Sequence, residues 1–224
     1  MRPARRVPVW ILVLLAASLA AQLLWHATRP AARQAADALP PPPRVQVLRL
    51  TAFGEDAAAA RLVMLYVQGF DVRALDYARL TGWLRAALAL DPRSAYPLFA
   101  AARVFAETPD PAASRIALEF VYQEFTKDPN RRWPWLAHAA LLAKHRLKDL
   151  PLARRYAAAI DRQTNSRDVP LWARQMEIFI LEDMNELEAA RVMLGGLLER
   201  GEIHDPNELR FLRQRLEELE KRVK

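Results

Sequence analysis

The sequence predicts an all-α protein built from antiparallel helix pairs that are joined by short loops. Only 6 of its 224 residues are glycine, which argues against a turn-dense β fold, and its many Ala, Leu, Arg and Glu residues favour helices. Apolar residues recur at steps of three and four from Ala57 onward, which is the spacing of one helix face. One such stripe consists of Leu80, Trp83, Leu84, Ala87 and Leu88.

The first element is an uncharged apolar stretch at residues 7–27, about as long as a membrane-spanning helix. Trp10 and Trp25 lie near its two ends, where indole rings prefer the level of the lipid headgroups. Three arginines within residues 1–6 outnumber those just after the stretch, so the positive-inside rule favours a cytoplasmic N-terminus. We therefore expect a basic flank at residues 1–6 and a transmembrane helix at residues 7–27.

Two other readings of this stretch stay open. A cleavable signal peptide is one, because Ser18-Leu19-Ala20 places small residues where a signal peptidase cuts. The apolar run continues beyond that point, through Leu23, Leu24 and Trp25. The other is a buried helix of a cytoplasmic protein, which alone of the three would keep the domain from being exported.

An Ala- and Pro-rich linker is expected at residues 28–56. The four prolines from Pro40 to Pro43 predict a polyproline II segment, a semi-rigid spacer that could hold the domain off the bilayer. A disordered connector is the alternative.

The charge of the chain is concentrated at its start. The formal net charge is +7, and residues 1–44 contribute six arginines against one aspartate, which leaves only +2 for the rest. The high pI is therefore weak support for nucleic-acid binding, and we expect no nucleic-acid partner. The absence of cysteine excludes disulfides, thiolate metal sites and Cys nucleophiles.

A repeat is visible between residues 57 and 204. Equivalent small or apolar residues occur at steps of 37, 36 and 37, and apolar partners follow four and seven residues later, with Glu124 as the departure. Proline-containing breaks separate the predicted helices. The repeat positions are Leu80, Ala117, Ala153 and Ala190, and the breaks are Asp91-Pro92, Pro109-Asp110-Pro111, Asp128-Pro129-Asn130, Asp149-Leu150-Pro151, Val169-Pro170 and His204-Asp205-Pro206.

With this pattern the chain resembles the tetratricopeptide repeat (TPR) superfamily over residues 57–204. The phrases at residues 87–92 (ALALDP) and 187–191 (LEAAR) are similar to parts of its second helix. The resemblance implies a TPR-like superhelix that binds other proteins. In layout, the whole chain also resembles an uncharacterised group of bacterial envelope proteins with one anchor and an exported repeat domain, and this second resemblance implies no particular activity.

The last predicted helix covers residues 205–224. Asp205 can cap it, Pro206 suits its first turn, and Glu208 completes a capping-box spacing. Its apolar residues form a seam of about two heptads. A capping helix that covers the end of the stack explains the seam, and a helix that binds a second copy or a partner is the alternative. The seam consists of Leu209, Leu212, Leu216, Leu219 and Val223.

The motifs of common enzymes are missing from the sequence, and we expect neither an enzyme nor a bound cofactor or metal. It contains no Gly-rich phosphate loop, no H-E-x-x-H and no G-x-S-x-G. His138 and His145 lie too far apart for an ordinary two-histidine metal site. A solvated helix face explains the acidic run better than paired catalytic carboxylates. That run consists of Glu177, Glu182, Asp183 and Glu186.

A candidate interaction site lies around residues 130–146, which hold two tryptophans, four cations and two histidines. Trp and Arg dominate binding hot spots. Alternatively, Trp133 and Trp135 staple two repeats together while the arginines stay in water, and Pro134 begins the helix. First helices of a curved array line its groove, which adds residues before and after this segment. The candidate partner-binding residues are Arg103, Arg131, Arg132, Trp135, His138, Arg174 and Gln175.

These observations predict a single-pass protein of the bacterial inner membrane, with its repeat domain in the periplasm. The likeness in layout to single-anchor proteins with exported repeats implies a scaffold, assembly factor or accessory chaperone of an envelope complex, with other proteins as partners. An enzyme or small-ligand-binding domain with an unusual site and a scaffold that faces the cytoplasm are the alternatives. The sequence does not indicate an oligomeric state.

Overall fold

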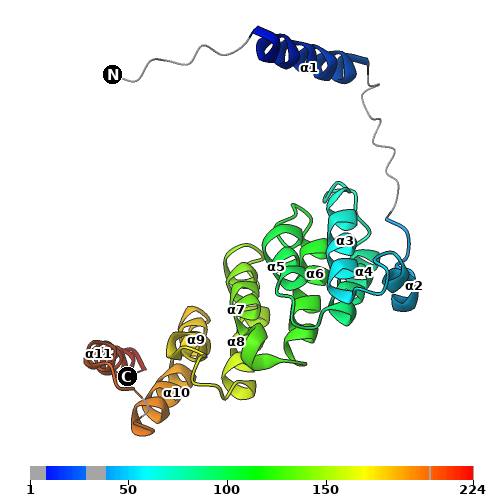
Figure 1. Ribbon diagram of the computed structural model, residues 1–224. Helices are drawn as coiled ribbons and strands as arrows, with labels where there is room; N and C mark the ends of the chain where they lie inside the picture. The colour runs from blue at the N-terminus through cyan, green and yellow to red at the C-terminus, as the bar shows by residue number, and fades with distance from the viewer. Residues whose placement is uncertain (1–8, 29–38, 202, 224) are drawn as a thin grey trace, which may run out of the picture. The chain divides into compact units, whose positions relative to one another are not determined.

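The computed structural model describes residues 9–28, 39–201 and 203–223, and every regular element among them is a helix. The all-α prediction is therefore confirmed (Figure 1). The chain divides into two compact units, residues 1–37 and residues 38–224. The helices are α1 (Val9–Thr28), α2 (Val45–Leu50), α3 (Asp56–Gln68), α4 (Tyr77–Leu90), α5 (Tyr96–Ala100) with its π-helical continuation η1 (Ala101–Phe105), α6 (Pro111–Phe125), α7 (Pro129–His145), α8 (Leu150–Gln163), α9 (Leu171–Asp183), α10 (Leu187–Glu199) and α11 (Pro206–Val223).

Helix α1 belongs to the first unit. It is 20 residues long, and the side chains of Leu14, Leu15 and Leu23 are exposed. Within the described parts of the chain, no helix combines the length and the apolar character needed to cross a membrane. The predicted transmembrane helix is thus without support from the structure. The predicted basic flank at residues 1–6 and residues 29–38 of the predicted linker lie outside the described residues.

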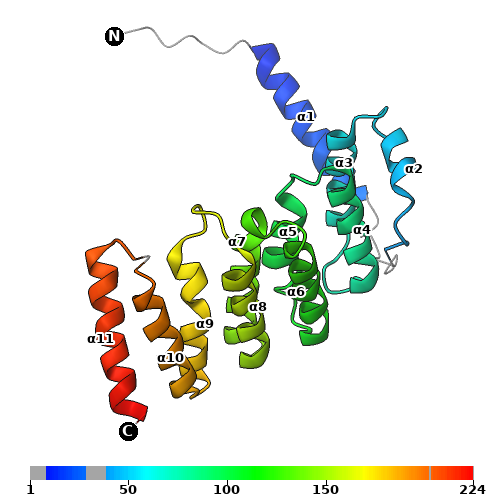
Figure 2. The same cartoon turned by 90° about the horizontal axis from the view of Figure 1, so that it is seen from below.

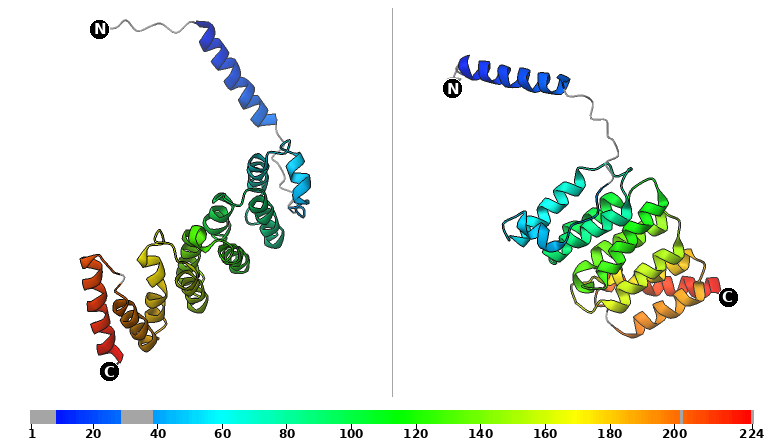
Figure 3. Two further views of the ribbon diagram at one scale, coloured as in Figure 1. Left: turned by 60° about the horizontal axis from the view of Figure 1, so that its bottom comes forward. Right: turned by 90° about the vertical axis from the view of Figure 1, so that its right-hand side faces the viewer.

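The second unit is a stack of antiparallel helix pairs. From α3 to α11, each helix packs mainly on its neighbours in sequence, and the pairs follow one another in a single direction (Figures 2 and 3). Contacts also join α5 and η1 to α7, and α4 to α6. We call α3, α5 with η1, α7, α9 and α11 the first-helix layer, and α4, α6, α8 and α10 the second-helix layer.

The second helices bury the repeat positions that the sequence indicates. Leu80, Ala117, Ala153 and Ala190 are each at most 1 % exposed. The residues four and seven positions later in each repeat are buried as well. They include Glu124, the one charged residue at these apolar positions. Small side chains at a buried position allow two helices to approach closely, so this register sets the spacing of the stack.

Polar contacts also follow the repeat. Arg85 Nη2 of α4 donates a hydrogen bond of 2.8 Å to Gln123 Oε1 of α6, 38 residues later. Arg155 of α8 donates to Glu119 of α6 across 36 residues, at 3.1 Å. Asn130 Nδ2, at the start of α7, donates to Asn165 Oδ1 at 2.8 Å, across 35 residues. These side-chain hydrogen bonds therefore join residues that lie about one repeat apart.

The helix boundaries agree with the predicted breaks, with one exception. The carboxylates of Asp76, Asp110 and Asp149 cap α4, α6 and α8 by accepting hydrogen bonds from the backbone N–H groups of the first turn. Helix α7 begins at Pro129, so the prediction that Pro134 starts it is wrong, and Pro134 lies within the helix. The earlier start has a simple reason: Pro129 already has the φ angle that the first turn requires.

The prediction of a linker at residues 28–56 is wrong from Leu39 onward. Leu39 is buried in the core, and its carbonyl oxygen accepts a hydrogen bond of 3.1 Å from Arg79 Nη1 of α4. Trp83 Nε1 of α4 donates to the carbonyl of Pro40 at 2.7 Å. An extended proline segment leaves its carbonyls free. Here side chains of α4 donate hydrogen bonds to the carbonyls of Leu39 and Pro40, so this segment is part of the domain. Helix α2 follows it.

Helix α11 packs along α9 and α10. Leu212 and Leu219 are buried there, in a cluster that includes Leu181 and Leu194. Gln175 Nε2 of α9 also donates a hydrogen bond of 2.9 Å to a carboxylate oxygen of α11. The predicted leucine seam therefore faces its own chain at the end of the stack.

The register of the repeat can be tested by overpacking. Ala117→Trp and Ala153→Trp each place an indole where two helices touch, and we expect each to lower the free energy of unfolding by about 1–3 kcal/mol or more. Chemical denaturation measures this change. Ala112→Trp is the matched control, because Ala112 lies exposed on α6 and should tolerate the ring. Unchanged stability in both buried variants would refute the alignment.

Candidate functional site

Aromatic side chains join successive first helices, and we call this series the aromatic ladder. The ring centroids of Phe99 on α5 and Trp135 on α7 are 5.7 Å apart. Those of Trp133 on α7 and Trp172 on α9 are 5.5 Å apart, and a third contact joins α9 to α11 at 6.4 Å. The ladder consists of Tyr96, Phe99, Trp133, Trp135, Trp172, Phe179 and Phe211.

The ladder is only half covered by protein. Trp172 and Phe211 are 53 % and 55 % exposed, Phe99 is also exposed, and both Trp133 and Trp135 are partly buried. Both tryptophans contact the next or the preceding repeat, as the staple interpretation expects. Large aromatic groups that are fixed by one contact and open to water on another side are typical of protein-binding surfaces.

The contact between α5 and α7 adds a polar pair to the aromatic pair. Phe99 and Arg103 are four residues apart, while Trp135 and His138 are three apart on α7, so each pair occupies one side of its helix. The Arg103 Nη1 atom lies 3.4 Å from His138 Nδ1. Of the predicted binding residues, Arg103, Trp135 and His138 are thus brought together.

Arg103 projects from the π-helix η1. The N–H group of Ala106 donates to the carbonyl of Ala101 at 2.9 Å, five residues back, instead of to the carbonyl four residues back. Single π-turns of this kind occur frequently at functional sites. The wider turn sets the position of Arg103 opposite α7.

The surroundings of His138 disfavour the protonated form of its imidazole. Burial lowers the pKa of its imidazole, and the guanidinium of Arg103 lowers it further, against the opposing effect of Glu107. Its Nε2 atom is 3.9 Å from Glu107 Oε1, which is too long for a hydrogen bond, and this buried nitrogen has no hydrogen-bond partner among the described residues.

The predicted residues of α9 hold the fold together. Arg174 Nη2 donates a hydrogen bond of 2.7 Å to the carbonyl of Ser166, in the loop before the helix. Gln175 is buried and donates to Glu208 of α11. Among the described residues, neither side chain makes a hydrogen bond or ion pair with Arg103 or His138, and Gln175 is closed off from a partner.

The expectation that both Arg131 and Arg132 stay in water is wrong for Arg132. The Arg132 side chain is only 10 % exposed, and its Nη1 atom donates to the carbonyl oxygen of Glu124 at 2.7 Å and to its carboxylate at 3.2 Å. Its Nη2 atom donates to the carbonyl of Pro92 at 3.2 Å. Arg131, in contrast, has a side chain that is 51 % exposed.

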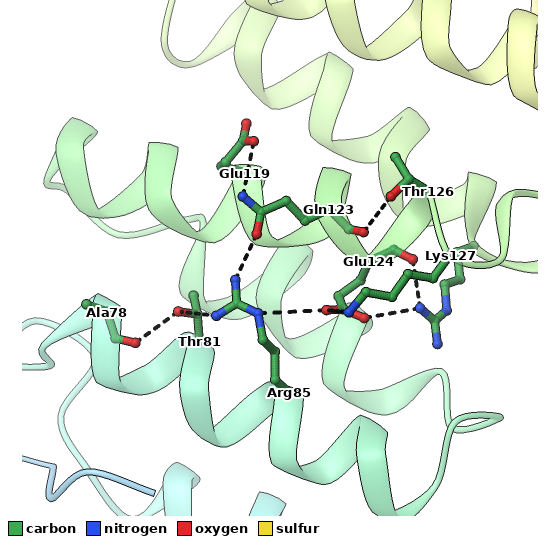
Figure 4. A network of polar contacts seen from close by, with 9 residues as sticks. Ala78, Thr81, Arg85, Glu119, Gln123, Glu124, Thr126 and Lys127 are labelled. Carbon is green, nitrogen blue, oxygen red and sulfur yellow. Dashed lines mark hydrogen bonds and ion pairs between the residues drawn. The ribbon is translucent and has the colours of Figure 1, made fainter.

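Glu124, the departure from the apolar repeat, is the centre of this polar network. Its side chain is 3 % exposed, and Lys127 Nζ lies 2.6 Å from its carboxylate. Figure 4 shows Arg85 reaching from α4 toward Gln123 and Glu124 of α6. A buried carboxylate needs such partners, because removal from water is costly. The break in the repeat pattern was the signal for this site in the sequence.

The acidic run of α9 is also only partly solvated. Glu177 is 1 % exposed and accepts a hydrogen bond of 3.1 Å from Arg154 Nε of α8. Glu182 is buried and pairs with Arg215 of α11. The solvated-face interpretation is therefore wrong for these two residues, because each lies where the neighbouring helix presents an arginine.

Of the residues in the aromatic ladder, only Trp135 is among the predicted binding residues. Phe99, Trp135 and Trp172 are separated by 36 and 37 residues, so these three aromatic positions share the period of the small ones. Phe211 departs from it, since it follows 39 residues later. That period in the first helices was the available signal.

The site offers aromatic area, one exposed guanidinium and a neutral imidazole, which suits binding. No cluster of His, Asp or Glu that could hold a metal ion exists in the described part of the chain. The chain matches no protein family profile, no curated protein and no solved structure at a significant level.

Truncation of the two adjacent arginines of α7 should change the free energy of unfolding by very different amounts. We expect Arg132→Ala to lower the free energy of unfolding by about 3 kcal/mol, because it leaves the buried Glu124 carboxylate without a main partner. Arg131→Ala, with the same chemical change, should cost about 0–1 kcal/mol. Urea unfolding of both variants measures this. Equal effects would contradict the buried position of Arg132.

The low pKa of His138 makes stability depend on pH. Because the pKa of this imidazole is lower in the folded chain than in the unfolded one, the unfolded state binds the proton first, and the free energy of unfolding falls as pH drops through about 6.5. His138→Gln should reduce this fall. His145→Gln, at an exposed position of α7, should leave it unchanged. Unfolding curves between neutral and mildly acidic pH test this, and identical curves for all three proteins would contradict it.

Proposed function

We propose that this chain is a membrane-anchored scaffold for protein–protein interaction, acting as an assembly factor or accessory chaperone of an envelope complex. In this proposal residues 7–27 hold the protein in the inner membrane, and the repeat domain faces the periplasm. The partner is another protein, bound on the first-helix layer.

The aromatic ladder is the observation that carries this proposal. It presents Phe99, Trp172 and Phe211 to solvent on three helices of the first-helix layer, and exposed Arg103 lies four residues after Phe99. Aromatic and arginine side chains contribute most of the energy of typical interfaces. Their extended arrangement suits a helix or an extended segment of a partner better than a small molecule, which needs an enclosed pocket.

The proposal includes a TPR-like superhelix that is closed by α11 as a capping helix. The antiparallel pairs and the side-chain bonds one repeat apart support the first part. The burial of Leu212 and Leu219 within the chain supports the second. A capping helix protects the last apolar surface of a repeat stack from water.

The anchor is proposed on the sequence of residues 7–27 and on the arginines before it. In α1, the exposed side chains of Leu14, Leu15 and Leu23 agree with a helix whose apolar surface meets lipid. The anchor would keep the ladder close to the membrane, where the components of envelope complexes lie.

Photo-crosslinking in living cells tests the proposed surface. With a photoreactive residue in place of Arg103 of the full-length protein, we expect capture of one dominant envelope protein, identified by mass spectrometry. The same probe at Val192, exposed on α10, should not capture it. Adding Trp172→Ser should lower the capture about tenfold or more, since hot-spot losses reach 2 kcal/mol. Val192→Ser is the matched control substitution.

Three results would contradict the proposal. Equal capture from Arg103 and Val192 would mean that the ladder does not select a partner. Capture of a cytosolic protein would point to the inverted topology. Absence of capture at both positions would refute the proposed interaction function.

A further inference from the structure

The cavities that border the second-helix layer are lined by a surplus of positive charge. Three cavities lie along this layer, with volumes of about 510, 440 and 320 Å³. Together they are lined by nine Lys or Arg residues and four Asp or Glu residues, a surplus of five. The chain beyond Arg44 has a surplus of only two, with 27 basic and 25 acidic residues. The rest of the domain is therefore net negative, and the positive charge is gathered at these cavities.

The largest of the three, which we call the basic cleft, lies where α4, α6 and the start of α7 meet. Five of its ten lining residues are cations and two are acids. Leu88, Ala89 and Pro92 give it an apolar wall. Its charged residues are Arg85, Arg93, Lys127, Arg131, Arg132, Glu124 and Asp128.

The acids of the cleft do not neutralise its cations. Glu124 is buried and fixes Arg132 and Lys127 by direct contacts of 3.2 and 2.6 Å, so one carboxylate positions two positive groups. Asp128 pairs with Arg131 at 3.4 Å. These contacts hold the cations in place before a ligand binds. Binding then loses less side-chain entropy.

Among the cations of the cleft, Arg93 is the one whose side chain has no acidic partner in the described part of the chain. It is exposed in the loop after α4, and its guanidinium makes no hydrogen bond or ion pair with any residue that the structure describes. The N-terminus of α7, a helix of 17 residues, lies at the same cleft and adds the positive end of its dipole. The cleft thus offers the unpaired guanidinium of Arg93, the ammonium of Lys127 with one ion-pair partner, and a helix N-terminus. Such groups favour the binding of carboxylate oxygens.

We propose that the basic cleft binds an acidic segment of a partner protein, in which carboxylate side chains alternate with apolar ones. The carboxylates meet Arg93 and Lys127, and the apolar groups lie on the wall formed by Leu88 and Pro92. A single-stranded nucleic acid fits less well, because its bases need aromatic side chains to stack on and none lines this cleft. No aromatic ring of the ladder lines this cleft, so the two sites have separate contact residues.

A peptide-binding measurement tests the proposal with the full-length chain in a neutral detergent. The probe is a fluorescein-labelled synthetic peptide in which glutamate alternates with alanine, and binding is followed by anisotropy at low and high salt. Arg93→Glu should weaken binding about tenfold or more, as expected for the loss of a charge-assisted hydrogen bond. Arg200→Glu is the matched control: it changes the net charge equally at an exposed position outside the lining of these cavities and should change affinity less than about twofold.

Each outcome has a definite meaning. Binding that depends on Arg93 and disappears when glutamine replaces glutamate in the peptide supports the proposal. Equal weakening by Arg93→Glu and Arg200→Glu would overturn it, because the attraction would then be nonspecific. Tighter binding of a single-stranded oligonucleotide than of the peptide would overturn it in favour of nucleic acid. The photo-crosslinking at Arg103 is read separately, so failure here leaves the interaction surface of the ladder standing.

Discussion

The close approach of each second helix to the first helices beside it is the constraint on which the whole stack depends. It requires small or well-fitting side chains at the repeat positions, and Ala117, Ala153 and Ala190 meet this requirement with almost no exposed surface. In a stack of this kind each repeat is stabilised mainly by its two neighbours. A change at one contact therefore acts locally on packing, but it also alters the position of every surface group further along the stack.

Buried ion pairs between helices complement this packing. Glu124, Glu177 and Glu182 are buried carboxylates, and each meets an arginine from another helix. Such pairs contribute little net stability, because desolvation offsets most of the attraction, but an unpaired partner is costly. A stack shifted out of register would leave these carboxylates alone, so the pairs act against wrong helix contacts.

The two helix layers present different chemistry to solvent. The first-helix layer carries partly exposed aromatic rings, whose contacts with the next repeat fix their orientation. The second-helix layer carries cavities rich in arginine. Because both surfaces are built on the same short-range stack, one chain can hold two binding surfaces in a fixed relation to each other, which suits a scaffold.

The sequence by itself determined the helical class, the proline-containing breaks and the buried small residues, because helix periodicity and proline act within a few residues. It also indicated Arg103, Trp135 and His138, which lie on one contact between two first helices. Only the tertiary structure decided the burial and the bonding of residues whose partners come from another helix or repeat. The proline segment after Leu39 packs on α4, Arg132 is buried while the adjacent Arg131 is not, and Gln175 bonds to α11. No local pattern separates such residues, since a side chain is buried or free according to the helix that is placed opposite it.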